Sequence, residues 1–148
     1  MDKSTVPGSF QEWVQTLPQV IKDSPVWPSV MYQKSLFLHE LCWIDCENWM
    51  HDALGKAIVE QITRSCGSIS ANIEEGFGRG FGKEYARFLT IAVASARETQ
   101  GWYFRVRHLT KAEVTEHRMR LCDEIIAMLV AAIKDQRRRL KAASKDRE

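Results

Sequence analysis

The sequence has no long apolar run and no recognisable leader. None of its apolar runs approaches the roughly 20 residues that a membrane helix needs. The first residues, MDKSTVPGSFQEW, lack the basic-then-apolar order of a signal peptide. With 45% hydrophobic and 27% charged residues over 148 positions, the composition is that of one globular domain. We therefore expect a cytoplasmic protein without a membrane partner.

Catalytic and metal-binding patterns are also scarce. The four histidines are scattered, no Glu-x-x-His pair occurs, and no serine or cysteine stands in a nucleophile motif. Cys42 and Cys46 lie one helical turn apart near His39, but a second ligand pair with finger-like spacing is missing. All four cysteines lie in apolar helical patterns, so we expect buried free thiols. The sequence predicts no enzyme, no metal and no cofactor.

Strand patterns and hairpin dipeptides are missing as well, whereas helical periodicity is strong. Four long helices are predicted, over residues 25–45, 52–75, 83–109 and 110–142. Ser24-Pro25 is a typical start for the first, and Gly76 is a candidate C-cap for the second. Thr110 with Glu113 forms a capping box for the fourth. Short turns between long helices predict an all-α, antiparallel up-down-up-down four-helix bundle.

The residues outside the bundle fall at its two ends. Residues 1–24 are predicted to form an N-terminal extension whose short helix is capped by Ser9 and ended by Pro18. Phe10, Trp13 and Ile21 would pack this extension on the body, which spans residues 25–142. The charged, alanine-rich residues 143–148 are expected to fray.

Apolar residues off the main stripes predict an interface between subunits. They are Met31, Leu36 and Trp43 on the first long helix and Ile126 and Val130 on the last. Because monomers seldom expose large apolar patches, these side chains favour a homo-oligomer.

Basic side chains follow one face of the third predicted helix. Lys83, Arg87, Arg97 and Arg105 follow one another at intervals of four, ten and eight residues, which keeps them on one side of a helix, and Arg79 lies just before them. Arginines along such a face could bind a nucleic-acid backbone. An ordinary solvated face or a network of ion pairs between subunits explains the pattern too. A denser cluster, Arg137–Arg139 with Lys141, is open between a nucleic-acid patch and a solvated helix end.

The loop GFGRGFG, residues 76–82, has three readings. Bare glycine amides before a helix could cradle phosphate, but a preceding strand and a Lys-Ser pair are missing. The favoured interpretation is a tight turn whose glycines allow positive φ, with Phe77 and Phe81 packed on the bundle end. Stacking of exposed phenylalanines on unpaired bases is the third.

Two adjacent segments resemble a known bacterial family. Ser68-Ile69-Ser70-Ala71-Asn72-Ile73-Glu74-Glu75-Gly76-Phe77-Gly78-Arg79 is similar to the pattern S-I-x-x-N-I-A-E-G-F-G-R of the 23S rRNA intervening sequence proteins. Lys83-Glu84-Tyr85-Ala86-Arg87-Phe88-Leu89 is similar to the K-E-F-x-R-F-L that follows it. Glu74 replaces a usual alanine, and the residues before Pro25 exceed the family norm.

The resemblance implies an antiparallel four-helix bundle that assembles into a homopentamer without enzymatic activity. Some family members are encoded inside rRNA genes. The accessory proteins of diversity-generating retroelements, which bind nucleic acid and a reverse transcriptase, share the architecture. Together with the basic stripe, this favours a homo-oligomer that binds RNA or single-stranded nucleic acid. The alternatives are a protein-interaction scaffold, for example for a reverse transcriptase, and a bundle that binds a small molecule.

Overall fold

The computed structural model describes residues 8–147, which are helical almost throughout and contain no strand. The elements in order are α1 (Phe10–Thr16), α2 (Gln19–Lys22), α3 (Val30–Trp49), α4 (Ala53–Gly78), α5 (Lys83–Arg105), the 3₁₀ helix η1 (Val106–Leu109) and α6 (Ala112–Lys145). The all-α prediction is confirmed. No described helix is both long and apolar enough to cross a membrane.

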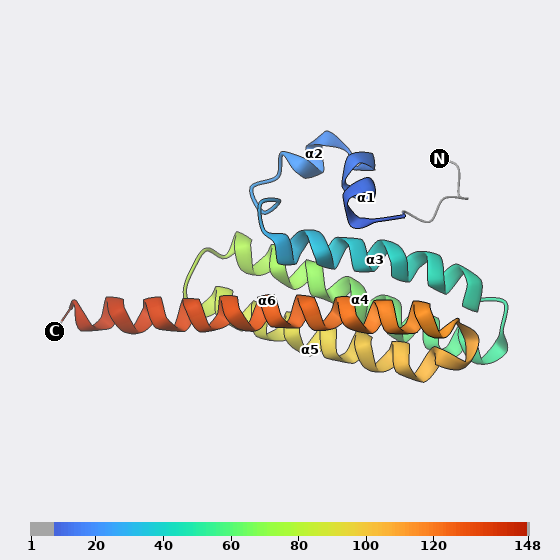
Figure 1. The fold of residues 1–148 in the computed structure, drawn as a ribbon. Coiled ribbons are helices and arrows are strands. Elements are labelled where there is room, and N and C mark those ends of the chain that lie inside the picture. Colours follow the sequence, from blue (N-terminus) through green and yellow to red (C-terminus); the bar gives the residue numbers. More distant parts are fainter. Residues whose placement is uncertain (1–7, 148) are drawn as a thin grey trace.

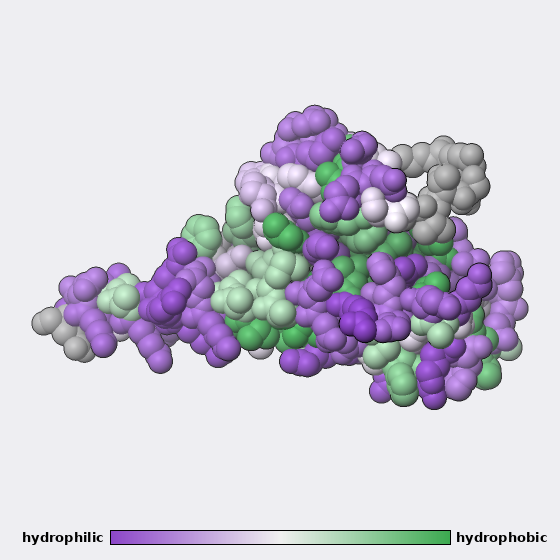
Figure 2. Space-filling model, viewed as in Figure 1, coloured by the Kyte–Doolittle hydropathy of each residue, from purple (hydrophilic) through white to green (hydrophobic). Residues whose placement is uncertain are grey.

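The four long helices form a bundle in which each packs beside the next. The most extensive contacts join α4 to α5 and α5 to α6, while α3 packs on α4 and, over a smaller area, on α6. Figure 1 shows these helices running in alternating directions, with the C-terminal part of α6 projecting past the ends of the others. The projecting part is covered mostly by hydrophilic side chains (Figure 2).

The core follows the apolar stripes of the sequence. Ile62, Cys66, Ile69 and Ile73 recur at three or four residues along α4 and are fully buried. Their counterparts on the other helices are Leu38 and Leu41 on α3, Leu89 and Ala96 on α5, and Ile125 and Leu129 on α6. The four cysteines are free and buried, as predicted.

The N-terminal extension packs on α3 through aromatic side chains. The Ser9 hydroxyl accepts a hydrogen bond from the Glu12 amide at 3.2 Å, which confirms the predicted cap. The rings of Phe10 and Trp13 lie 5.5 and 5.2 Å from the ring of Phe37. Trp13 is buried, Phe10, Val14 and Leu17 are partly buried against the core, and Ile21 is half-buried.

Helix α3 begins and ends later than predicted. Residues 24–29 form turns, because Pro28 has no amide hydrogen to continue a helix from Ser24, and α3 starts after Ser29. At its other end α3 continues to Trp49, since the buried stripe extends through Cys46 and Trp49. The prediction of a start at residue 25 and an end at residue 45 was therefore wrong.

Gly76 lies inside α4, and the prediction that it caps this helix was wrong. A Cβ atom at this position would lie 2.9 Å from the Cβ of Phe88 and 3.2 Å from the ring of Tyr85. Glycine thus lets α5 approach α4 closely. The helix ends at Gly78, and positive φ angles occur at Gly80 and Gly82.

The junction of α5 and α6 also differs from the prediction. Helix α5 ends at Arg105, and the tighter η1 takes up residues 106–109. Thr110 is then extended, and the first helical hydrogen bonds of α6 run to the Lys111 carbonyl, so Thr110 does not cap the helix. Helix α6 reaches Lys145, three residues beyond the predicted end. Fraying of the last residues stays a prediction.

Part of the apolar surface assigned to a subunit interface lies within the single chain. Met31 and Ile126 are buried in the core, and Leu36 and Val130 are half-buried against it. Trp43 is different, because 59% of its surface is exposed. Trp43 therefore carries the remaining argument for a partner on this side of α3.

Candidate nucleic-acid surface

The five predicted nucleic-acid residues lie along α5 and at the end of α4. Arg79 is the C-cap residue of α4, and Lys83, Arg87, Arg97 and Arg105 lie on α5. All five are exposed. Because a helix rises about 1.5 Å per residue, Lys83 and Arg105 lie roughly 33 Å apart along the axis. The structure thus makes them an elongated stripe and not a single cluster.

Two of these arginines are paired with acidic neighbours. Arg79 Nη2 lies 2.7 Å from Glu75 Oε1, and Arg87 Nη2 lies 3.3 Å from Glu84 Oε2. Both guanidinium groups flank the ring of Phe88, at 5.8 and 4.5 Å from its centre. Such exposed pairs contribute little stability and exchange readily for another anion.

The other end of the chain joins this surface. A groove of about 610 Å³ lies between the start of α5 and the end of α6. Its basic side chains are Lys83 and Arg87 from α5 and Arg137 and Lys141 from α6; we call these four residues and the space between them the basic groove. Ala86, Thr90, Ile91 and Leu140 form the rest of its lining. None of the described residues that line it is acidic.

A smaller hollow continues the basic groove along α6. It measures about 290 Å³ and is lined by Lys134, Arg137, Arg138 and Lys141. Arg138 and Arg139 both pair with Asp135. Within residues 8–147, Lys83, Arg137 and Lys141 form no ion pair. The sequence presents the C-terminal cluster and the α5 stripe as separate features, but the structure joins the cluster to the first two α5 residues of the stripe, Lys83 and Arg87, in one basic surface.

The glycine-rich loop has the geometry of a turn. Gly80 and Gly82 adopt φ angles of 84° and 104°, which side chains rarely tolerate. The Gly82 amide donates a hydrogen bond to Gln136 Oε1 at 3.3 Å, so the loop is attached to α6. This supports the favoured interpretation as a turn. Phe81 does not pack into the bundle end as predicted, because 78% of its surface is exposed.

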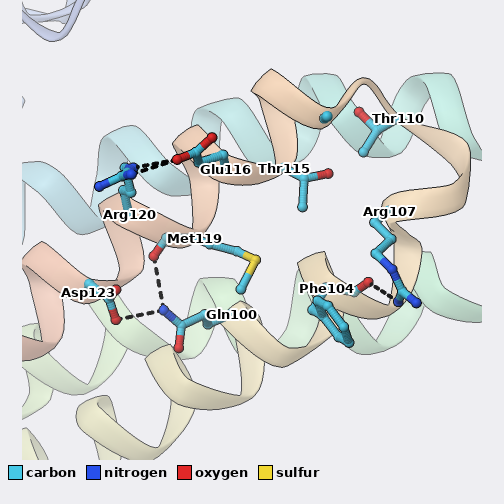
Figure 3. A pocket seen from close by; sticks show the side chains of 10 residues that line it. Gln100, Phe104, Arg107, Thr110, Thr115, Glu116, Met119, Arg120 and Asp123 are labelled. Carbon is cyan, nitrogen blue, oxygen red and sulfur yellow. Dashed lines mark hydrogen bonds and ion pairs between the residues drawn. The ribbon is translucent and has the colours of Figure 1, made fainter.

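A second groove lies at the opposite end of α5, where η1 leads into α6. It measures about 640 Å³, and Phe104, Met119 and Thr115 line it together with side chains of both charges (Figure 3). The Gln100 amide donates hydrogen bonds to the Met119 carbonyl and to Asp123 Oδ1, and so spans α5 and α6. Since its charged side chains are mixed in sign, this groove is a poor match for a polyanion.

Sequence reasoning missed a buried ion pair. Asp45 on α3 accepts hydrogen bonds from Arg118 Nε at 2.8 Å, from Arg118 Nη2 at 3.1 Å and from the Tyr103 hydroxyl at 3.0 Å. Both charged side chains are less than 10% exposed. Burial raises the pKa of the Tyr103 hydroxyl well above its usual value. The sequence contained one signal for this ion pair: Asp45 is a charged residue that follows Leu38 and Leu41 on the buried stripe of α3.

The four cysteine thiols are buried, and hydrogen bonds, chiefly with Cys46 and then with Cys66, lower the pKa of the Cys42 thiol. Cys42 and Cys46 approach to 3.9 Å between their sulfur atoms. Burial raises the pKa of the Cys122 thiol to about 12, which keeps it protonated near neutrality. Among residues 8–147, no three histidine, cysteine or acidic side chains form a group that could hold a metal ion.

Comparisons with known proteins identify the family. The model of the 23S rRNA-intervening sequence protein family matches residues 29–131, from the N-cap of α3 to well within α6. A crystal structure of a protein with unknown function from the S23 ribosomal protein family of Bacteroides thetaiotaomicron superposes with a TM-score of 0.67 at 26% identity. The match covers 71% of this chain and 99% of that one. None of the curated proteins matches. Because the family model matches most of the bundle, the chain belongs to the 23S rRNA-intervening sequence protein family.

Proposed function

We propose that this protein binds RNA through the basic groove and performs no catalysis. The observation that carries the proposal is the meeting of α5 and α6: Lys83 and Arg87 from one helix face Arg137 and Lys141 from the other across a lining without acidic side chains. Four cations around one groove attract a polyanion, and arginine adds bidentate hydrogen bonds to phosphate.

The name of the family favours RNA over other polyanions, because it refers to a sequence within 23S rRNA. The descriptions of the family and of the structural neighbour name no enzymatic activity. The stripe residues Arg79, Arg97 and Arg105 lie outside the basic groove. We propose that they contact the same nucleic acid on either side of it.

Fluorescence anisotropy with a labelled RNA, repeated over a salt series, tests the proposal. Each phosphate contact that is lost should reduce the slope of log K against log salt by roughly one unit. Lys83→Ala and Arg137→Ala are therefore expected to weaken binding and to lower this slope. The matched control is Lys56→Ala, which removes one exposed lysine near the start of α4, at the opposite end of the bundle. An affinity independent of salt, or equal effects of Lys83→Ala and Lys56→Ala, would refute the proposed site.

We further propose that the protein works as a homopentamer. Trp43 on α3 and Met50, the C-cap residue of that helix, lie seven residues apart, and Leu54 follows at the start of α4; all three are exposed. A monomer gains nothing from this apolar surface, whereas a second copy could cover it. Light scattering should give five times the 17.0 kDa of the chain, and Trp43→Glu should lower the mass. A monomeric wild-type protein would contradict this assembly.

The second candidate function is a scaffold for another polypeptide, such as a reverse transcriptase. The second groove, where η1 leads into α6, favours this function. Exposed Phe104 lies beside Met119 there, among side chains of both charges, and such a surface resembles a protein-binding site. Co-purification of a reverse transcriptase encoded next to this gene, lost on Phe104→Ala but retained on Lys83→Ala, would support the scaffold. RNA binding that is lost on Lys83→Ala but retained on Phe104→Ala would support the first proposal.

A further inference from the structure

Phe81 is the most exposed of the large aromatic side chains on the described surface. It stands between Gly80 and Gly82, which both adopt positive φ angles. Its ring contacts only part of the neighbouring Tyr85 ring, edge to face at 5.8 Å between centres. Exposing a phenylalanine forgoes the stabilisation that burial would give, so the position of this side chain is not explained by folding.

The loop that carries Phe81 borders the basic groove. Lys83, a groove residue, follows Phe81 by two positions. The Gly82 amide is held by Gln136 of α6, and a Cβ atom at Gly82 would lie 3.6 Å from Leu140, another lining residue. The hydrogen bond to Gln136 fixes the loop against α6. Phe81 itself does not line the groove, but it lies in the loop that leads directly into the groove residue Lys83.

We infer that Phe81 is a stacking platform for an unpaired base, which makes the basic groove a site for single-stranded RNA in preference to a duplex. The inference rests on the proposed RNA-binding function and specifies its substrate class. Proteins that bind single strands combine a basic groove for the backbone with aromatic rings on which bases stack. In a duplex the base faces are occupied by neighbouring pairs, so an aromatic ring at the protein surface gains no contact with them.

The chemistry of the lining fits this assignment. Ala86, Ile91 and Leu140 provide apolar surface between the cations, which suits the sugar and base faces of a splayed strand. Arg87 can exchange its exposed partner Glu84 for a phosphate. The ring and the cations thus address the two parts of a nucleotide separately.

The test compares a fluorescein-labelled single-stranded RNA with the duplex of the same sequence, using the full-length protein. Wild type is expected to bind the single strand more tightly. Phe81→Ala should lose roughly 5- to 150-fold in affinity for the single strand, which is the range for one base stacked on an aromatic side chain. The salt slope should stay unchanged, because no phosphate contact is removed. Phe81→Trp should retain binding.

Phe81→Leu separates stacking from general apolar contact. It keeps a large apolar side chain but has no ring, so it is expected to behave as Phe81→Ala does. Val20→Ala, which shortens another highly exposed apolar side chain on α2, is the matched control and should bind as wild type. Circular dichroism should show every variant folded, since each altered side chain is exposed.

Three results would overturn the inference. They are equal affinity for the single strand and the duplex, wild-type binding by Phe81→Ala or Phe81→Leu, and a fall in oligomer mass on Phe81→Ala, which would assign the ring to a contact between copies. In the first two cases RNA binding itself survives. If wild type binds neither RNA, or if Lys83→Ala affects RNA binding no more than Lys56→Ala does, the proposed function fails together with the inference.

Discussion

Removing the charge of Asp45 should destabilise the bundle more than any change to its surface ion pairs. Asp45 accepts two hydrogen bonds from Arg118 and one from Tyr103, joining α3, α5 and α6 at one buried point. The substitution Asp45→Asn keeps the shape of the side chain but leaves the guanidinium of Arg118 without its counter-charge. Both side chains are more than 90% buried, so water cannot compensate.

Asp45→Asn is expected to lower the free energy of unfolding by about 3–5 kcal/mol, which is typical when one partner of a buried ion pair is removed. The triple replacement Asp45→Leu, Arg118→Met and Tyr103→Phe removes the ion pair and the hydroxyl bonded to Asp45 at once, and leaves His117, which also contacts Arg118, in place. Because it leaves no buried charge and no unpaired hydroxyl, its cost should be well below that of the single substitution. A large loss of stability in Asp45→Asn and a small one in the triple variant would show that the cost comes from the unpaired buried charge of Arg118.

Urea denaturation followed by circular dichroism, at one fixed protein concentration, measures both free energies of unfolding. Glu116→Gln is the control, since it breaks the pair between Glu116 and Arg120, whose side chains are 63% and 74% exposed. Its cost should stay below about 1 kcal/mol. If Asp45→Asn costs no more than Glu116→Gln, or if the triple variant costs more than Asp45→Asn, the reasoning is refuted.

Three further predictions concern packing, acidity and the thiols. Gly76→Ala should destabilise by about 1–3 kcal/mol in urea melts because its methyl group meets Phe88, whereas Gly78→Ala, whose Cβ enters open space, should be neutral or stabilising. Burial first, and then the neighbouring guanidinium, lowers the pKa of His117, so the unfolded chain binds more protons below about pH 6.5. Stability should therefore fall from pH 7.5 to 5.5, less so in His117→Gln; equal falls would contradict this. The four buried thiols should react with a thiol reagent only after denaturation, and labelling of Cys122 in the native protein would contradict its burial.

Periodicity alone was enough to identify the four long helices and their buried stripes. Helix-forming residues that repeat an apolar position every three or four residues can bury that face only against other helices, so Ile62, Ile69 and Ile73 determine both the helix and its orientation. The family could also be recognised from the sequence, because the motif around Gly76 and Arg79 is one continuous segment. Helix boundaries were less accurate. Near Pro28 and the glycines, a helix can begin or end at several positions. Packing selects one of them, and α4 thus continues through Gly76.

The candidate site needed the tertiary structure. Lys83 and Arg137 lie 54 positions apart in the sequence, and whether their helices meet at the same end depends on the order and direction of the helices in the bundle. The exposure of Phe81 and the burial of Met31 and Ile126 also depend on which neighbours cover them. Local pattern determined which residues are basic, apolar or turn-forming, because these properties belong to single side chains. Only long-range packing decided which of them share a surface, because that depends on contacts between distant segments.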